Sequence, residues 1–214
     1  PLQEHRMAIR SKWLRLTEET NALDYLEKAA WFILQTEKDL LAWKWVVLSL
    51  HGALYGFAIC ACQGTNYENV VTKNKKGEEK LIPFDKALEL CQDNKHMGML
   101  VHSQPLVLTG TQSDSIRRLK KKLRNKMEHY VPSGWSIEVH GMPAITIDVL
   151  DVIKFLAIET RTYIHLNQAQ MKRVNSLVFQ SKKFLRKTRL YQEAIQAQSG
   201  ITRRSTGRAK AARR

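Results

Sequence analysis

The sequence predicts an all-α protein: a bundle of four to five helices with a small hairpin or loop insertion and a basic C-terminal helical extension. Apolar residues recur at three- and four-residue steps in several segments, which is the period of a helix with one buried face. In addition, neither proline nor glycine interrupts the chain between Pro143 and Gly200. A chain of 214 residues has room for one domain plus an extension, and it buries about 70% of its unfolded surface.

The first predicted helix spans about residues 19–37. Its apolar stripe consists of Leu23, Leu26, Ala30, Ile33 and Leu34. A second, much more apolar helix starts at Asp39 and ends at Gly64, which is a suitable C-terminal cap. Because this helix is apolar on all sides, we expect it to be the central helix of the bundle.

The second helix also approaches the ~20 apolar residues that cross a bilayer. Gly52 and Gly56 form the G-x-x-x-G pattern that packs membrane helices. Lys44 and His51 interrupt the helix, however, and the charges on its flanks are mixed. We therefore favour a core helix in which the two glycines let another backbone approach closely, in the core or at a dimer interface. A membrane-associated protein is the alternative.

The pattern changes after this helix. Two β-prone pieces, residues 70–72 and 81–82, flank the turn-forming residues 74–77, which indicates a small hairpin or a loop. A short helix is expected over about residues 83–93. Residues 94–111 contain two glycines, a proline and no sustained period, so we expect a loop there that can include a short turn.

The third long helix is predicted to have Ser113 as its N-cap and to run from Asp114 to about Tyr130. Pro132 ends it, because the residue before a proline is pushed out of the α region. Its inner stripe consists of Ile116, Leu119, Leu123 and Met127. His129 is then expected in the last helical turn, where the helix dipole favours a cationic imidazole.

The last helical signal runs from about residue 146 to 198. One straight helix of that length measures about 80 Å at 1.5 Å per residue, so we expect a break near residues 167–175. The first part completes the bundle with Ile147, Leu150, Ile153, Phe155 and Leu156. We divide the chain into a helical bundle (1–166), a basic helical extension that serves as a dimerisation or RNA-contacting arm (167–199) and a basic disordered tail (200–214).

The net charge of +15 is distributed unevenly along the chain. Residues 160–214 contain fourteen basic residues and one acidic residue, a net charge of +13, which leaves +2 for residues 1–159. Evenly soluble surfaces mix both signs, and a concentrated positive charge favours a polyanion partner because phosphate contacts release counterions. We therefore expect RNA as the partner, with a solvated helix face and tail as the alternative.

The segment RNKMEH carries the candidate catalytic residues Arg124, Asn125 and His129. On a helix, Asn125 and His129 share one face, and the long side chain of Arg124 reaches toward it. A guanidinium grips phosphate, an amide orients an oxygen, and an imidazole moves a proton near neutral pH. RNA cleavage requires no more when the adjacent 2′-hydroxyl attacks phosphorus and the 5′-oxygen leaves with a proton.

The spacing of Arg124 and His129 is common by chance, so the interpretation depends on the helix end and the adjacent asparagine. His51 is a candidate supporting residue, with a hydrogen-bonded core histidine as the alternative. Tyr130 is a candidate for stacking on a base, although it can instead anchor the helix end. The basic candidates for RNA backbone contact are Arg117, Arg118, Lys121 and Lys122, together with Lys120 and Lys126, and the alternative for the lysines is ordinary solvation.

At these residues the chain resembles the HEPN superfamily of small helical nucleases, whose signature is Arg, a polar residue, and His after a gap of four to six. Two further stretches, AWKWVVLSLHGALYGFAICACQGTN and LIPFDKALELCQD, resemble a plasmid-borne branch of that superfamily. The resemblance spans about residues 20–165 and excludes the basic tail. It implies a HEPN-like bundle that dimerises so that two motifs face each other across one cleft. It also implies a toxin or abortive-infection ribonuclease in which Arg124 and His129 are catalytic and Asn125 positions the site.

We therefore expect a metal-independent endoribonuclease that acts as a cytoplasmic homodimer, with a neutralising antitoxin as a further partner and no membrane contact. The alternative is a non-catalytic RNA-binding HEPN protein. We expect no cofactor and no zinc site: Cys60 and Cys62 are two apart on a helix and point to nearly opposite sides, and Cys91 and His96 have no second ligand pair. Three cysteines without a framework spacing favour a reducing compartment.

Overall fold

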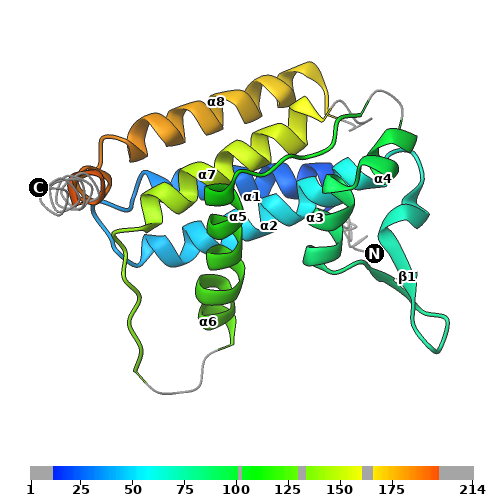
Figure 1. Ribbon diagram of the computed structural model, residues 1–214, viewed down its shortest axis with the longest axis horizontal. Helices are drawn as coiled ribbons and strands as arrows, with labels where there is room; N and C mark the ends of the chain where they lie inside the picture. Colours follow the sequence, from blue (N-terminus) through cyan, green and yellow to red (C-terminus); the bar gives the residue numbers. More distant parts are fainter. Residues whose placement is uncertain (1–11, 101–102, 130–133, 161–165, 198–214) are drawn as a thin grey trace, which may run out of the picture.

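A pair of antiparallel helices forms the centre of the computed structural model, which describes residues 12–100, 103–129, 134–160 and 166–197 (Figure 1). Helix α1 spans Glu18–Ile33 and begins at a capping box, in which the Thr17 hydroxyl accepts from the backbone N–H of Thr20. Helix α2 spans Ala42–Gln63. The all-α prediction is thus confirmed, and both central helices were expected.

Helix α2 is the core helix of the bundle. It contacts α1, α3, α7 and the helical segment that precedes α6, and Leu50, Leu54 and Phe57 are completely buried. It ends as expected at Gly64, which has a φ of 59°. By length and composition α2 alone, among the described helices, is apolar enough to cross a membrane, but 72% of its apolar window is buried inside the bundle.

Gly52 and Gly56 both face α1, and the close approach of another backbone that the sequence predicted is found at Gly56. A Cβ atom on Gly56 would lie 2.7 Å from the Cβ and 3.2 Å from the Cα of Ala22. A Cβ atom on Gly52 would instead lie 2.7 Å from the ring of Tyr25, whose side chain is 40% exposed. The neighbour of Gly56 is thus fixed backbone, whereas the neighbour of Gly52 can rotate outward.

A small hairpin follows α2, as expected. Strands β1 (Val71–Lys73) and β2 (Glu79–Leu81) pair antiparallel, with Thr72 opposite Lys80. The predicted short helix is α3, Phe84–Gln92. The prediction of a loop over residues 94–111 is wrong in part, because Asn94–Met99 forms helix α4, capped by the Asp93 carboxylate, and α5 already begins at Gly110.

The third long helix differs from the prediction at both ends and in its interior. Helix α5, Gly110–Arg117, is capped by Thr109 rather than Ser113, and Gln112 completes the capping box. A π-helical segment, Arg118–Arg124, separates it from the short helix α6, Asn125–Glu128. The predicted inner stripe is nevertheless buried, with exposures between 1% and 8% for Ile116, Leu119, Leu123 and Met127.

The last two labelled helices, α7 and α8, lie side by side (Figure 1). Helix α7 spans Met142–Lys154, with Pro143 in its first turn, and continues into a π-helical segment, Phe155–Glu159. Helix α8, Gln168–Leu185, begins after the Asn167 cap, at the edge of the region where a break was expected. Residues 189–197 are also helical, and the predicted tail lies outside the described residues.

Helix α8 contributes to the core although it was predicted as an extension. It packs against α1 and α7. Its buried apolar residues are Val174, Leu177, Val178 and Leu185. An ion pair between Arg173 and Glu27, 2.8 Å apart, also joins α8 to α1. Lys172, Arg173 and Lys183 of α8 are exposed, whereas Lys182 faces α7 through its ion pair with Asp151.

Candidate active site

The three predicted catalytic residues lie at the two ends of the short helix α6. Arg124 is the last residue of the π-helical segment, and Asn125 is the first residue of α6. The Asn125 N–H donates to the carbonyl of Lys120, five residues earlier, which is the hydrogen bond of a π-helix. The wider turn immediately before the motif is a common feature of functional sites, and the apolar pattern did not predict it.

The expectation that His129 lies in the last helical turn is wrong. The helix ends at Glu128, and His129 has a φ of −125° and a ψ of 70°. Its backbone N–H still donates to the carbonyl of Asn125 over 2.9 Å. Because the backbone leaves the helix at this residue, helix geometry alone does not hold the imidazole over the Asn125 side chain.

A residue that the sequence interpretation missed connects the motif. The Glu128 carboxylate lies 2.5 Å from Nη2 of Arg124 and 3.9 Å from Nε2 of His129. Nη1 of Arg124 also donates to Oδ1 of Asn125 over 3.2 Å. The signal for Glu128 was present, since an acidic residue four positions after an arginine on a helix favours an ion pair.

The guanidinium and the imidazole differ in their exposure. The Arg124 side chain is 28% exposed, whereas the His129 side chain is 73% exposed. Nε of Arg124 is buried and has no hydrogen-bond partner among the described residues, and such an orphan donor carries a desolvation cost. The arrangement therefore offers the partly buried guanidinium of Arg124 for binding a phosphate and the solvent-accessible imidazole of His129 for proton transfer.

His51 lies beside the motif but is not the hydrogen-bonded core histidine of the alternative interpretation. Its ring stacks on Phe84, with the centroids 4.7 Å apart, and no described residue hydrogen-bonds to it. Burial, and then the positive charges of Arg124 and Lys120, lower the pKa of His51 to about 4. His51 is therefore neutral at pH 7, where it adds no charge to the site but retains a hydrogen-bond acceptor.

Lys120 ties the motif segment to α3. Its ammonium group forms an ion pair with the Asp85 carboxylate and lies 5.6 Å from the centroid of the Phe84 ring. It is thus engaged by α3 rather than free in solution. The contact places the positive charge of Lys120 close to His51, which is one cause of the lowered pKa.

Two of the remaining predicted residues, Arg117 and Arg118, contact other parts of the chain. Arg117 pairs with Asp114 over 2.6 Å, and the guanidinium of Arg118 lies against Gly141. Lys121 and Lys122 are exposed and form no ion pair with a described residue. Tyr130 lies outside the described residues.

The cysteines lie in the core. Cys60, Cys62 and Cys91 are all buried free thiols. Burial raises the pKa of Cys60, and a hydrogen bond with Cys62 followed by burial raises that of Cys91, so both remain protonated at neutral pH. Within the described ranges, no three His, Cys, Asp or Glu side chains are grouped so that they could hold a metal ion.

Comparison with known proteins provides no family for this chain: no protein-family model, curated protein or solved structure matches it. The function must therefore be argued from the motif and its surroundings.

Proposed function

We propose that this chain is a metal-independent endoribonuclease with Arg124, Asn125 and His129 at its active site. The observation that carries the proposal is that Arg124 contacts both Asn125 and the Glu128 carboxylate, and that His129 lies near the same carboxylate. The resemblance of the motif and of two further stretches to HEPN nucleases adds support, and with it we propose the HEPN-like bundle.

Each residue has a distinct role in the proposed reaction. The Arg124 guanidinium binds the phosphate oxygens and stabilises the charge that develops on phosphorus, with Asn125 orienting it. His129 takes the proton from the 2′-hydroxyl, whose oxygen attacks phosphorus. The P–O5′ bond breaks, the 5′-oxygen receives a proton, and the products are a 2′,3′-cyclic phosphate and a 5′-hydroxyl.

The reaction needs one group that removes a proton and another that supplies one. The motif provides a single imidazole, and His51 is neutral and half-buried against Phe84. We propose that the second imidazole is His129 of another copy, in a homodimer that places two motifs at one cleft. This arrangement makes cleavage dependent on dimerisation.

Cleavage in EDTA tests the proposal directly. Purified chain is incubated with labelled RNA, and the product ends are analysed for a 2′,3′-cyclic phosphate. His129→Ala should lower the rate by about 10²–10⁴ and Arg124→Ala by about 10²–10³. Lys75→Ala, which removes an exposed charge in the hairpin, should have no effect.

Two further measurements complete the test. Arg124→Lys keeps the charge but not the bidentate geometry, so its activity should also fall without loss of the fold. Wild-type cleavage should fall with the square of protein concentration once the dimer dissociates. Equal cleavage by wild type and both alanine variants would refute the assignment, and RNA binding without turnover by wild type would favour the non-catalytic alternative.

The biological role that we propose is that of a cytoplasmic toxin or abortive-infection ribonuclease, held inactive by an antitoxin protein. Expression of the wild-type chain in bacteria should then arrest growth, and expression of the His129→Ala variant should not. Arrest by both chains would exclude RNA cleavage as its cause.

A further inference from the structure

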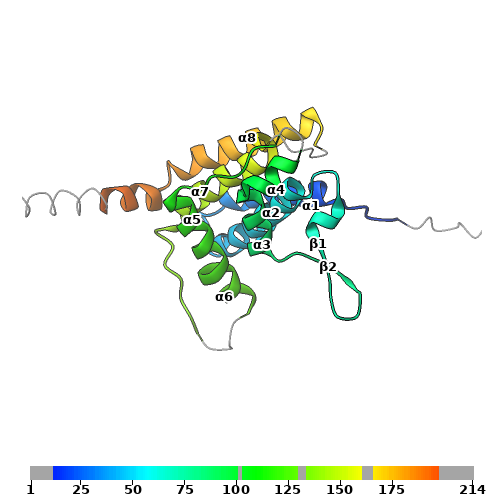
Figure 2. The same ribbon diagram turned by 45° about the vertical axis from the view of Figure 1, so that its right-hand side comes forward.

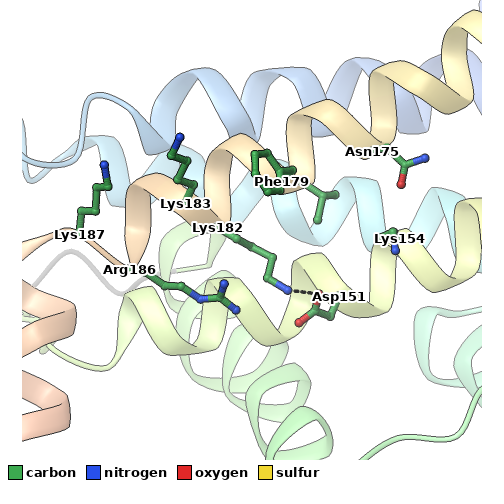
Figure 3. Close-up of a pocket in the computed structure, with 9 residues that line it drawn as sticks. Asp151, Lys154, Asn175, Phe179, Lys182, Lys183, Arg186 and Lys187 are labelled. Carbon is green, nitrogen blue, oxygen red and sulfur yellow. Dashed lines mark hydrogen bonds and ion pairs between the residues drawn. The ribbon is translucent and has the colours of Figure 1, made fainter.

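A groove of about 740 Å³ lies between α7 and α8 (Figure 3). Its lining residues are Asp151, Lys154, Asn175, Val178, Phe179, Lys182, Lys183, Arg186 and Lys187. Five of them belong to α8, on which Asn175, Phe179 and Lys183 follow one another at four-residue steps, and Arg186 and Lys187 come directly after its end. One wall of the groove thus combines a polar, an aromatic and several basic side chains.

The groove carries an excess of positive charge. Five of its lining residues are cationic, and Asp151 is the one carboxylate among them. Asp151 forms an ion pair with Lys182, and Lys154 pairs with Glu159 over 2.7 Å. Lys183, Arg186 and Lys187 form no ion pair with any residue that the structure describes, so three charges remain available to an anion. Figure 3 shows Lys182 and Arg186 extending from α8 toward α7.

Phe179 stands exposed in the middle of these cations. Phe179 is 67% accessible to solvent, whereas Val178 and Leu185 of the same helix are buried in the core. The bundle therefore does not need the Phe179 ring for packing. An exposed aromatic ring flanked by unpaired cations is the combination with which proteins bind single strands, because bases stack on the ring while the cations follow the phosphates.

We infer that this groove binds single-stranded RNA, with one base stacked on Phe179 and the adjacent phosphates on Lys183, Arg186 and Lys187. The choice of RNA over other polyanions rests on the proposed ribonuclease function. An anionic membrane is less suitable, because the cations lie along a concave groove between two helices rather than on a protruding surface. A duplex is also less suitable, since its bases are already stacked on one another.

The groove is separate from the candidate active site. In Figures 1 and 2, α8 lies on one side of α7, whereas α6 extends away on the other side. The groove thus holds RNA at a distance from the phosphate that is cleaved. Groove variants should raise KM for long RNA and leave kcat unchanged, and cleavage of a dinucleotide too short to reach the groove should not respond to them.

Binding is measured by fluorescence anisotropy with a labelled single-stranded 20-mer RNA and full-length chain carrying His129→Ala, so that the RNA stays intact. In this background, Phe179→Ala should raise Kd about tenfold, within the range for loss of one stacked base. The triple variant Lys183→Gln/Arg186→Gln/Lys187→Gln should also raise Kd. It should reduce the slope of log K against log salt by about 2, since each lost contact with a single strand removes about 0.7.

A matched control removes the same charge elsewhere. Lys75→Gln/Lys76→Gln/Lys80→Gln neutralises three exposed lysines of the hairpin, and RNA affinity should change less than twofold. An equal loss in this control would overturn the inference, because binding would then depend on net charge alone. Phe179 is exposed, so its alanine variant should melt as the parent does, and a change in Kd then reports the groove.

Competition identifies the ligand. A duplex of the same sequence, or vesicles with 30% phosphatidylserine, should compete at least tenfold more weakly than the single strand. Competition by vesicles that equals the single strand and depends on Phe179 would overturn the inference in favour of a membrane surface. Absence of cleavage by wild type together with Phe179-dependent RNA binding would refute the proposed function and leave the binding groove in place. Normal cleavage of long RNA with unchanged KM in both groove variants would refute RNA binding in the groove and leave the proposed ribonuclease function in place.

Discussion

Replacement of His51 by phenylalanine tests whether this histidine is buried against α3 beside the motif cations. Phenylalanine preserves the ring that stacks on Phe84 but cannot titrate. The pKa of His51 falls from 6.5 to about 4 in the folded chain. The folded state thus favours the neutral ring, and the unfolded chain binds more protons between these two values. The contribution to stability is complete above pH 6.5 and is lost as the pH falls toward 4.

The size of the effect follows from the two pKa values. At pH 5 an unfolded histidine is mostly protonated and the folded one mostly neutral, so the linkage relation gives a loss of about 2 kcal/mol relative to pH 8. For a chain of this size, 1 kcal/mol corresponds to roughly 2–4 °C in Tm. The wild-type chain should therefore lose about 4–8 °C more than His51→Phe between pH 8 and pH 5.

Thermal unfolding of both proteins at the two pH values measures this difference, and the contributions of all other titrating groups cancel in the comparison. NMR titration of His51 adds a site-specific readout. Arg124→Gln should raise the pKa of His51 because Arg124 is the largest charge contribution after burial, whereas Lys75→Gln should leave it unchanged. An identical loss of Tm in wild type and His51→Phe, or a His51 pKa near 6.5, would refute the reasoning.

Three further predictions concern the packing, the caps and the motif. Gly56→Ala should destabilise the chain by up to about 2 kcal/mol, because an overpacking cost of ~1–3 kcal/mol is only partly offset by a gain in helix propensity of ~1 kcal/mol. Gly52→Ala should change stability less, and the two melting curves check the order; greater damage from Gly52→Ala would contradict the packing. Thr109→Ala should cost about 1 kcal/mol of unfolding free energy in urea as a lost N-cap, while Ser113→Ala should be neutral, and the reverse result would place the helix start at Ser113. Glu128→Gln should reduce the cleavage rate by about tenfold or more without changing RNA affinity, because it releases the guanidinium from its fixed position; full activity in this variant would show that Glu128 does not position the site.

The sequence by itself determined the features that depend on short-range patterns. The apolar run of α2 and its end at Gly64, the hairpin and the buried stripe of Ile116, Leu119, Leu123 and Met127 all agree with the structure. Each follows from a local cause: a repeat of apolar residues, a glycine with positive φ, or a turn between two β-prone pieces. The candidate residues Arg124, Asn125 and His129 could likewise be selected by residue type.

Short elements and exact helix boundaries were beyond the sequence pattern. Helix α4 has six residues, of which only Met97 is buried, so it is too short to show an apolar period. Thr109 and Ser113 are both good capping residues, and only the interaction with Gln112 distinguishes the observed cap. The π-helical segment before the motif is defined by its backbone hydrogen bonds. Its apolar stripe suits an α-helix equally well, so the pattern of apolar residues could not reveal it.

Only the tertiary structure decided which side chains meet. The neutrality of His51 depends on α3, which supplies Phe84, and on the motif segment, which supplies the charges of Lys120 and Arg124. The groove exists because α8 packs alongside α7, which leaves Phe179 exposed above Asp151 and Lys154. The physical reason is the same in both cases: periodicity specifies which face of a helix is buried, but the environment of a side chain depends on the neighbouring helix against which it packs.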